Sequence, residues 1–290
     1  MSETELRIAA HEGSIEKVQE LLSNPAIDIN KGDEHGWTPL LLVCWKGDYE
    51  MVKFLINDPR IDVNFPMADG ATPLYIACEC GHVKIVKLLV NDPRVDVNKE
   101  KNGGFSPFEI ACECGNLEVV KFLIKETRID VQKGANGDFS PFFMTCQQNQ
   151  LEVAKFLLTH ERIDVNQVTR FGNSPIWIAS YLGHINIVKW CLASGKEINT
   201  KTKLNRKEYL KYAEHFPGLK HYVDFFKTLN EDYLGIRDVL KMKQFHDLES
   251  LIFAYETDPI QTKSDLRKEL GLSGLFIYFS FIYLFTYLFI

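Results

Sequence analysis

Residues 69–98 read DGATPLYIACECGHVKIVKLLVNDPRVDVN, and this stretch contains one complete structural repeat. It opens on an Asp-Gly turn signal. Thr72 followed by Pro73 predicts the start of a short helix, because the hydroxyl caps the helix and proline suits its first position. Gly81 predicts the end of that helix, because glycine readily adopts a positive φ.

A second helix is predicted over residues 83–90, where apolar residues return with helical spacing. Asn91-Asp92-Pro93 stops this helix. The last four residues, 95–98, are short and extended and lead into the next turn. The repeat is therefore turn, helix, turn, helix and extended hairpin, and it is too thin to bury its own apolar face.

The repeat recurs with a period of 34 residues. Ser/Thr-Pro pairs begin at positions 38, 72, 106, 140 and 174. Glycines keep the same interval at 13, 47, 81, 115 and 183, and Asn149 holds the one slot that differs. A strict period of this size predicts stacked repeats that bury one another's apolar faces. We therefore predict an all-α solenoid of helix-turn-helix-hairpin repeats, followed by a short C-terminal hydrophobic tail.

This pattern resembles the ankyrin repeat, roughly D-x-x-G-x-T-P-L-x-x-A-x-x-x-G-x-x-x-I-V-x-x-L-L-x-x-x-A-D-V-N. The resemblance covers residues 4–200. In the quoted repeat the matching residues are Asp69, Gly70, Thr72, Pro73, Leu74, Ala77, Gly81, Val86, Leu88, Leu89 and Asp96-Val97-Asn98.

The chain departs from the family pattern in three ways. Its linker N-D-P-R-(I/V)-D-V-N is one residue longer than the usual one, which accounts for the period of 34. Asp138 replaces the glycine before Ser/Thr in one repeat. The usual histidine after P-L is replaced in every repeat, by Leu41, Tyr75, Glu109, Phe143 and Trp177.

The period also divides the chain. The segments are a repeat stack over 1–200 (an N-terminal cap at 4–30 and five repeats over 31–200), an irregular aromatic helical insertion at 201–237, a degenerate capping repeat with a charged helix at 238–270, and a hydrophobic tail at 271–290.

The tail GLSGLFIYFSFIYLFTYLFI carries no charge. As a helix it would extend about 30 Å, enough to cross a bilayer. Arg267 and Lys268 precede it, which favours a cytoplasmic N-terminus for such an anchor. Three interpretations stay open: a membrane anchor, a hydrophobic extension packed on the domain, or translated AT-rich non-coding sequence, which would give the same Phe, Ile, Leu and Tyr composition.

Composition limits the classes of partner. The formal net charge is −6 with 25% charged residues, which argues against a general nucleic-acid binder. The polar start, Met1–Ala10, is unlike a signal peptide, and the seven cysteines then indicate reduced thiols in the cytosol. We expect a cytoplasmic monomer, with membrane tethering through residues 271–290 as the alternative.

The cysteines form two C-x-C pairs, Cys78/Cys80 and Cys112/Cys114. Residues two apart on a helix do not face each other, and no histidine has ligand spacing, so we predict no metal site. One column, at 44, 78, 112 and 146, occupies a slot where the family has a small apolar core residue. Cys80 and Cys114 are instead predicted to be exposed and reactive.

No pattern of residues predicts catalysis. Ser/His/Asp sets, H-E-x-x-H and Gly-rich phosphate loops are missing from the sequence, so we predict neither an enzyme nor a cofactor. His82 and His184 take a family-typical place where histidine bridges turns. An arginine column, at 60, 94, 128 and 162, precedes an aspartate column by two residues. It is interpreted as a solvated edge in preference to a charge ladder.

The resemblance implies that partners contact the hairpin tips and the exposed ends of the first helices, on the concave side. The corresponding residues are Glu34, His35, Trp37, Trp45, Lys46, Ala71, Glu79, Cys80, Phe105, Glu113, Cys114, Phe139, Gln147, Gln148, Asn173, Tyr181 and Leu182. Exposed aromatic residues are costly unless covered, and Trp and Tyr are common interface anchors, which favours Trp37, Trp45 and Tyr181. Phe105 and Phe139 have the alternative of folding over their own hairpins.

The predicted function is non-catalytic protein–protein recognition by a scaffold. The specific partner is not identified by the sequence. A membrane-anchored scaffold is one alternative, and an adaptor or enzyme that uses residues 205–237 is another.

Overall fold

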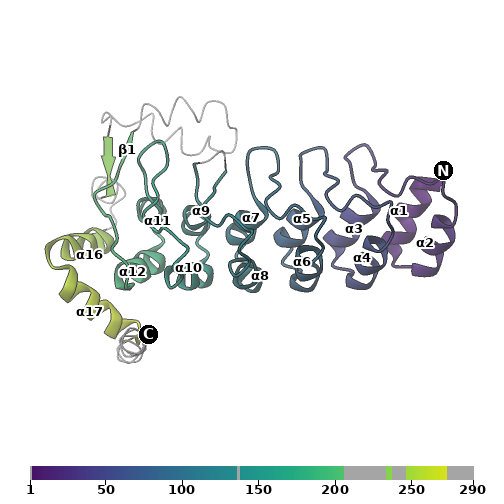
Figure 1. The fold of residues 1–290 in the computed structure, drawn as a ribbon. Coiled ribbons are helices and arrows are strands. Elements are labelled where there is room, and N and C mark those ends of the chain that lie inside the picture. The colour runs from purple at the N-terminus through teal and green to yellow at the C-terminus, as the bar shows by residue number, and fades with distance from the viewer. Residues whose placement is uncertain (1, 136–137, 206–232, 237–245, 273–290) are drawn as a thin grey trace, which may run out of the picture. The chain divides into compact units, whose positions relative to one another are not determined.

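The computed structural model contains two compact bodies. The described residues are 2–135, 138–205, 233–236 and 246–272. The first body comprises residues 1–153 with 162–164, and the second comprises 154–161 with 165–290. Figure 1 shows the order of the helices along the chain.

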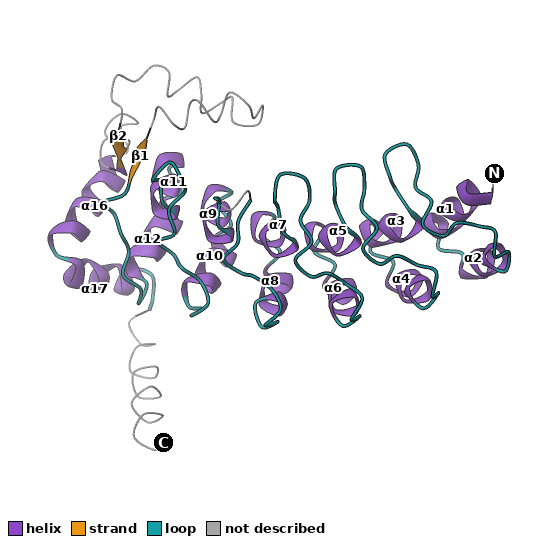
Figure 2. Ribbon diagram, turned by 45° about the horizontal axis from the view of Figure 1, so that its top comes forward, coloured by secondary structure: helices purple, strands orange, loops and turns teal. Residues whose placement is uncertain are grey.

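The first body is built from pairs of short helices. They are α1 (Ser2–Glu12), α2 (Ile15–Leu22), α3 (Pro39–Lys46), α4 (Tyr49–Ile56), α5 (Pro73–Glu79), α6 (Val83–Val90), α7 (Pro107–Glu113), α8 (Leu117–Leu123) and α9 (Pro141–Gln147). The first helices α1, α3, α5, α7 and α9 contact one another in order, as do the second helices α4, α6 and α8. Hairpin loops rise from the row of first helices (Figure 2).

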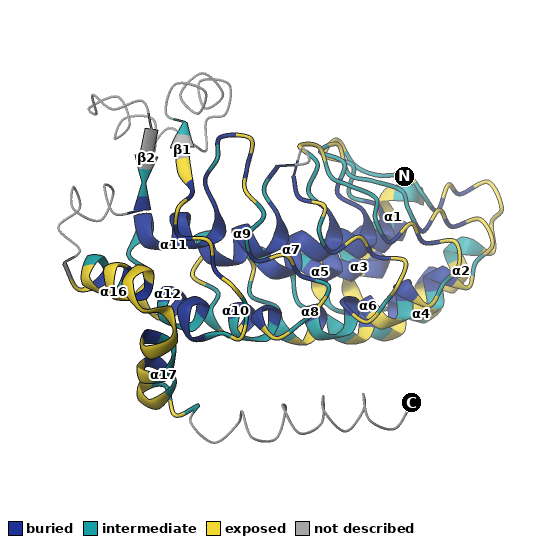
Figure 3. Cartoon of the chain, turned by 60° about the vertical axis from the view of Figure 1, so that its left-hand side comes forward, coloured by how far each residue is buried: buried dark blue, intermediate teal, exposed yellow. Residues whose placement is uncertain are grey.

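Burial differs between the two rows. In α5 every residue from Pro73 to Cys78 is buried, whereas α6 buries only Ile85, Val86, Leu89 and Val90. Figure 3 shows the first helices as mostly buried and the exposed residues gathered along the second helices and loops. The first helices are therefore the core, and the second helices cover them with one apolar face.

The ends of the first helices follow the sequence prediction. Thr38, Thr72, Ser106 and Ser140 each accept a hydrogen bond from the backbone N–H three residues on, and proline follows each of them. Gly47 ends α3 with φ of 82°. Asn149, in the glycine slot after α9, has φ of 57° and is the only non-glycine residue with positive φ in the described part of the chain. It therefore keeps the glycine conformation.

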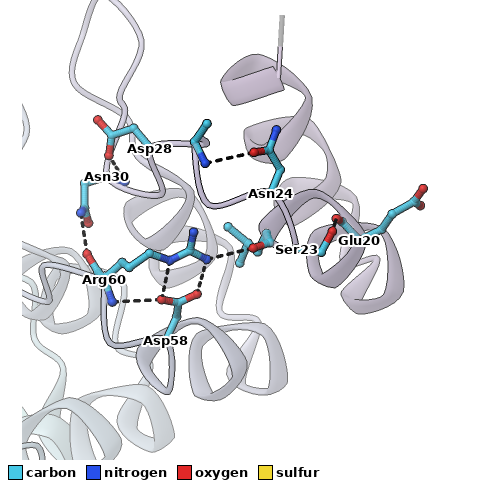
Figure 4. A network of polar contacts seen from close by, with 9 residues as sticks. Glu20, Ser23, Asn24, Asp28, Asn30, Asp58 and Arg60 are labelled. Carbon is cyan, nitrogen blue, oxygen red and sulfur yellow. Dashed lines mark hydrogen bonds and ion pairs between the residues drawn. The ribbon is translucent and has the colours of Figure 1, made fainter.

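The arginine column joins successive repeats. Arg60 donates from Nη2 to the carbonyl oxygen of Leu22, the last residue of α2, at 3.1 Å, and an ion pair of 2.7 Å to Asp58 holds its guanidinium (Figure 4). The same bond joins Arg94 to Ile56, Arg128 to Val90 and Arg162 to Ile124. The final carbonyls of a helix lack intrahelical donors. The side chains of Arg60, Arg94 and Arg128 are 34–46% exposed, as expected of a solvated edge. They also have a role that the sequence did not predict, because they satisfy the ends of the second helices.

An asparagine column makes a second connection. Asn30 donates from Nδ2 to the carbonyl oxygen of Arg60 at 2.8 Å, and its Oδ1 accepts from the N–H of Asp62 at 2.8 Å. Asp28 orients Asn30 by accepting its N–H at 2.9 Å (Figure 4). Asn64 and Asn98 repeat this pair of bonds. Each hairpin is thereby bonded to the next one.

The second body continues with another helix pair and a C-terminal cap. Its elements are α11 (Pro175–Leu182), α12 (Ile185–Ala193), β1 (Lys203–Asn205), β2 (Tyr233–Gly235), α16 (His246–Thr257) and α17 (Pro259–Glu269). The strands pair antiparallel, with Lys203 opposite Gly235. α17 packs on α12, and Arg267 donates from Nε to the carbonyl oxygen of Ala193 at 2.9 Å. One further helix, α10 (Leu151–Leu158), contains residues of both bodies.

Parts of the predicted C-terminal organisation lie outside the described residues. These parts are most of the aromatic insertion, at 206–232, the start of the degenerate repeat, at 237–245, and most of the tail, at 273–290. Within the described ranges, no helix combines the length and apolar composition needed to cross a membrane.

Replacing Asn64 by alanine should destabilise the repeat stack. The change removes the bonds to the Arg94 carbonyl and the Asp96 N–H. We expect the free energy of unfolding in urea to fall by about 1–3 kcal/mol. Asn91→Ala is the matched control, because Asn91 is exposed in the neighbouring loop. Equal stability of the two variants would contradict the role given to Asn64.

Two substitutions at Asn149 should show whether its positive φ, and not its side chain, is what stability requires. Asn149→Gly should retain full stability, because glycine adopts a positive φ without strain. Asn149→Val should lose about 1–2 kcal/mol, because a Cβ-branched residue is strained there. Urea unfolding curves test both variants, and equal losses would refute the conformational explanation.

Candidate functional site

The ends of α3, α5, α7 and α9, which pack in succession, form a strip of exposed and half-buried residues in the first body. We call it the helix-end strip, and its residues are Trp45, Lys46, Glu79, Cys80, Glu113, Cys114, Gln147 and Gln148. Neighbouring repeats touch along it, since Gln148 donates from Nε2 to Glu113 Oε1 at 3.1 Å. The structure thus brings together most of the residues that the sequence placed at helix ends.

The backbone beneath the strip is fixed by side chains of the following repeat. His82 Nε2 lies 3.0 Å from the carbonyl oxygen of Trp45, which confirms the predicted bridge between turns. Asn116 donates to the Glu79 carbonyl at 2.8 Å, and Gln150 donates to the Glu113 carbonyl at 2.8 Å. The backbone of the strip is therefore fixed by bonds within the chain itself.

An aromatic pair marks one end of the strip. Trp45 is 51% exposed, and its ring meets that of half-buried Trp37 edge to face, with centroids 6.2 Å apart. The hairpin that carries Trp37 is fixed because Asp33 accepts the Trp37 N–H at 3.0 Å and pairs with Arg7 at 3.1 Å. The predicted exposure of Trp45 is confirmed.

Three of the predicted binding residues are buried instead. Tyr181, in the second body, is 1% exposed because its ring stacks on Trp177 at 5.4 Å, so its predicted exposure was wrong. Ala71 and Asn173 are buried at their hairpins. The Asn173 carboxamide accepts a hydrogen bond from Thr169, which draws its side chain inward. None of the three offers a free surface.

The phenylalanines at two hairpins are half-buried. The ring of Phe105 lies against Gly103 of its own hairpin. The ring of Phe139 lies 5.4 Å from that of Phe143. Both arrangements agree with the alternative that the two phenylalanine rings fold over their own hairpins. Trp37 and Trp45 are therefore the better candidates for partner binding among the predicted aromatic residues of the first body.

The remaining predicted residues differ in exposure. Glu34 and His35 are exposed at a hairpin tip, with 3.7 Å between Glu34 Oε1 and His35 Nε2. Lys46 is exposed and donates to the His11 carbonyl at 2.5 Å. Gln147 is half-buried, as is Leu182 in the second body.

Carboxylates dominate the middle of the strip. Burial raises the pKa of Glu113, and the neighbouring Glu79 raises it further, against the hydrogen bond from Gln148. Lys101 opposes this rise, but its ammonium is already 2.8 Å from Asp69 Oδ2 and 5.4 Å from the ring centroid of Tyr75. The centre of the strip is therefore electronegative.

The column of core cysteines is buried as predicted, but Cys80, which was predicted to be exposed, is half-buried. Cys44, Cys78, Cys112 and Cys146 are buried in the core. Cys114 is exposed as a residue, yet partial burial of its thiol and the nearby Glu113 and Glu79 raise the pKa of that thiol to about 11. The pKa of Cys80 is also raised, by burial and by Glu79. Because the thiolate is the nucleophile, these raised pKa values argue against the predicted reactivity of Cys80 and Cys114.

Metal binding has no support from the described part of the chain, where no three His, Cys, Asp or Glu side chains gather in a way that could hold an ion.

Sequence reasoning did not single out Glu109, which lies on α7 beneath the strip. It is 0% exposed, and Oε1 accepts the N–H of Ala135 at 3.1 Å. Its Oε2 is buried without a hydrogen-bond partner among the described residues. Burial, with Glu113 and Glu100 as further causes, raises the pKa of Glu109 to about 8. The available signal was a charged residue in a slot that is otherwise apolar.

Comparisons with known proteins agree with this geometry. A family model described as ankyrin repeats (3 copies) matches residues 46–135 and 108–202, and one described as ankyrin repeats (many copies) matches residues 6–56. Among solved structures, 513 chains match. One is the ankyrin repeat domain of Bcl-3, described as a unique member of the IkappaB protein family. It has a TM-score of 0.60 and 21% identity, over 67% of this chain and 86% of that chain. At this identity the match shows the fold, which is the predicted all-α repeat solenoid. The comparison with curated protein sequences found no match.

Replacing Glu109 by glutamine should change how stability depends on pH. An unfolded glutamate has a pKa of about 4.3, so between there and pH 8 the folded state keeps a proton that the unfolded chain loses. The free energy of unfolding must then fall as pH rises through this window, by up to about 1.4 kcal/mol per pH unit. Glu109→Gln imitates the protonated acid and should remove that fall.

Urea unfolding at pH 5 and pH 9 measures the difference. We expect Glu109→Gln to match the wild type at pH 5 and to exceed it at pH 9. Exposed Glu50, on α4, gives the control Glu50→Gln, which should follow the wild type at both values. If the difference in unfolding free energy between Glu109→Gln and the wild type were the same at both pH values, the raised pKa of Glu109 would be contradicted.

Proposed function

Since the chain belongs to the ankyrin repeat family, we propose that it is a non-catalytic scaffold that binds a partner protein through the helix-end strip and hairpin tips of its first body. The observation that carries this proposal is Trp45, a large aromatic residue that is 51% exposed beside Trp37.

The aromatic pair suits an interface anchor. Trp45 presents a large apolar surface at low conformational cost, and truncating a hot-spot residue of an interface costs about 2 kcal/mol or more. The edge-to-face contact with Trp37 holds its ring, so little side-chain freedom is lost when a partner covers it.

The strip also combines a constant frame with variable chemistry. The carbonyls of Trp45, Glu79 and Glu113 all receive a bond from the next repeat, so the frame repeats. The side chains presented on it change from tryptophan and lysine to glutamate and cysteine and then to glutamine. A fixed frame lowers the entropic cost of binding, and its variable side chains select the partner.

Replacing Trp45 by alanine should reduce partner binding without unfolding the chain. In affinity purification followed by quantitative mass spectrometry, we expect the recovery of the specific partner to fall at least tenfold. Ile8→Ala is the matched control, because Ile8 is 47% exposed on α1, outside the strip. Circular dichroism checks the fold of both variants. Undiminished recovery by folded Trp45→Ala would refute the proposal.

A further inference from the structure

The charge of the helix-end strip identifies the chemistry of the partner. We propose that the strip binds an extended basic segment of a partner protein, with one cationic side chain stacked on Trp45 and others beside Glu79 and Glu113. This inference rests on the proposed function and deepens it. Its support comes from charge, burial and spacing.

The strip and the adjacent hairpin hold three carboxylates, Asp69, Glu79 and Glu113, against two cations, Lys46 and Lys101. Glu79 and Glu113 occupy the same position in successive repeats, and Asp69 lies nearby at a hairpin. Lys101 pairs with Asp69, and Lys46 donates instead to the His11 carbonyl. Among the ion pairs of the described residues, none involves Glu79 or Glu113. A partner that supplies cations would therefore relieve the repulsion between Glu79 and Glu113.

The charge of Glu113 also acts on Glu109, which lies on the same helix beneath the strip. Glu109 precedes Glu113 by four residues on α7, so both carboxyl groups lie on one face of that helix. Its Oε2 is fully buried and has no hydrogen-bond partner within the described residues. With a pKa of about 8, Glu109 itself carries no charge at neutral pH, but besides burial the charge of Glu113 is one cause of this raised pKa. A cation bound at Glu113 would therefore lower the pKa of Glu109.

The exposed indole of Trp45 fits the same ligand. Guanidinium and ammonium groups bind the faces of aromatic rings, and tryptophan is the best of these rings. Arginine suits this position because its planar group both stacks and donates hydrogen bonds to carboxylates. An anionic segment, such as a nucleic-acid strand or an acidic peptide, would instead meet Glu79 and Glu113 with like charge.

The repeat spacing sets the spacing of the cations. Trp45, Glu79 and Glu113 lie at the ends of α3, α5 and α7, which pack in succession. Packed helices are about 8–10 Å apart, and an extended chain advances about 3.3 Å per residue. A segment that crosses the repeats would therefore place a cationic residue about every third position, in the pattern Arg-x-x-(Lys/Arg)-x-x-(Lys/Arg), in either direction.

Selection from a random 12-residue peptide library displayed on phage, with the full chain as bait, tests this inference. We expect the enriched peptides to carry Arg or Lys at i and i+3, and often also at i+6. The best peptide, labelled with fluorescein, then serves as the probe for anisotropy titrations. We expect its affinity to fall at least tenfold in E79Q/E113Q and in W45A, and to weaken as salt rises.

The double variant E50Q/E118Q is the matched control. It removes two charges from exposed glutamates of the second helices and should leave the affinity unchanged. Enrichment of peptides without the spaced cations, or equal binding by E79Q/E113Q and wild type, would overturn the inference. A natural partner that depends on Trp45 but not on Glu79 and Glu113 would also overturn it, while the proposed function stands. Independence of all three residues would overturn both.

Discussion

The repeat stack depends on how the carbonyl groups at the ends of its second helices are satisfied. These helices are only seven or eight residues long, so the unpaired carbonyls of the last turn are a large share of their backbone groups. Arg94 reaches back to the carbonyl of Ile56, and Asp92 holds its guanidinium at 2.6 Å. Because the donor belongs to the next repeat, no helix pair is complete without its neighbour.

The same constraint explains the longer repeat. The linker N-D-P-R contains both members of the pair, the acidic residue and the arginine two positions later. Asn64 then bonds the Arg94 carbonyl at 2.7 Å and the Asp96 N–H at 2.8 Å. The hairpins and the second helices are thus joined by separate sets of bonds. Together they fix the register in which the first helices, and with them the helix-end strip, are presented.

The sequence predicted those features that depend on local chemistry. Thr72 caps a helix by accepting the N–H of Tyr75, and Pro73 follows it. The capping residue, the proline and the capped N–H therefore all lie within four residues of sequence. The glycine column after the first helices could also be predicted from the sequence. Asn149 has a positive φ, which shows that this position requires the left-handed backbone conformation and not glycine itself. For the same reason the positions of Trp45 and Glu113 at helix ends could be predicted.

What could not be predicted depends on neighbours far along the chain. The acceptor for Arg94 is a backbone carbonyl 38 residues earlier. Every residue has a backbone carbonyl, so the residue types alone do not indicate which one accepts the bond. Tyr181 looked like an exposed helix end until its ring was found stacked on Trp177. Glu109 looked like one more substitution at the histidine slot, and only burial reveals its raised pKa.

The backbone bonds between repeats stabilise the fold, whereas the side chains of the strip include unfavourable electrostatic contacts. Glu79 and Glu113 repel each other, and Glu109 is buried with an unpartnered oxygen, so each of these residues destabilises the fold as it stands. The backbones of Glu79 and Glu113 are nevertheless held by Asn116 and Gln150 from the following repeats. Local conflict on a well-supported frame is typical of functional positions, because a residue selected for binding need not favour the unbound fold. The electronegative strip is therefore better explained by a partner than by stability.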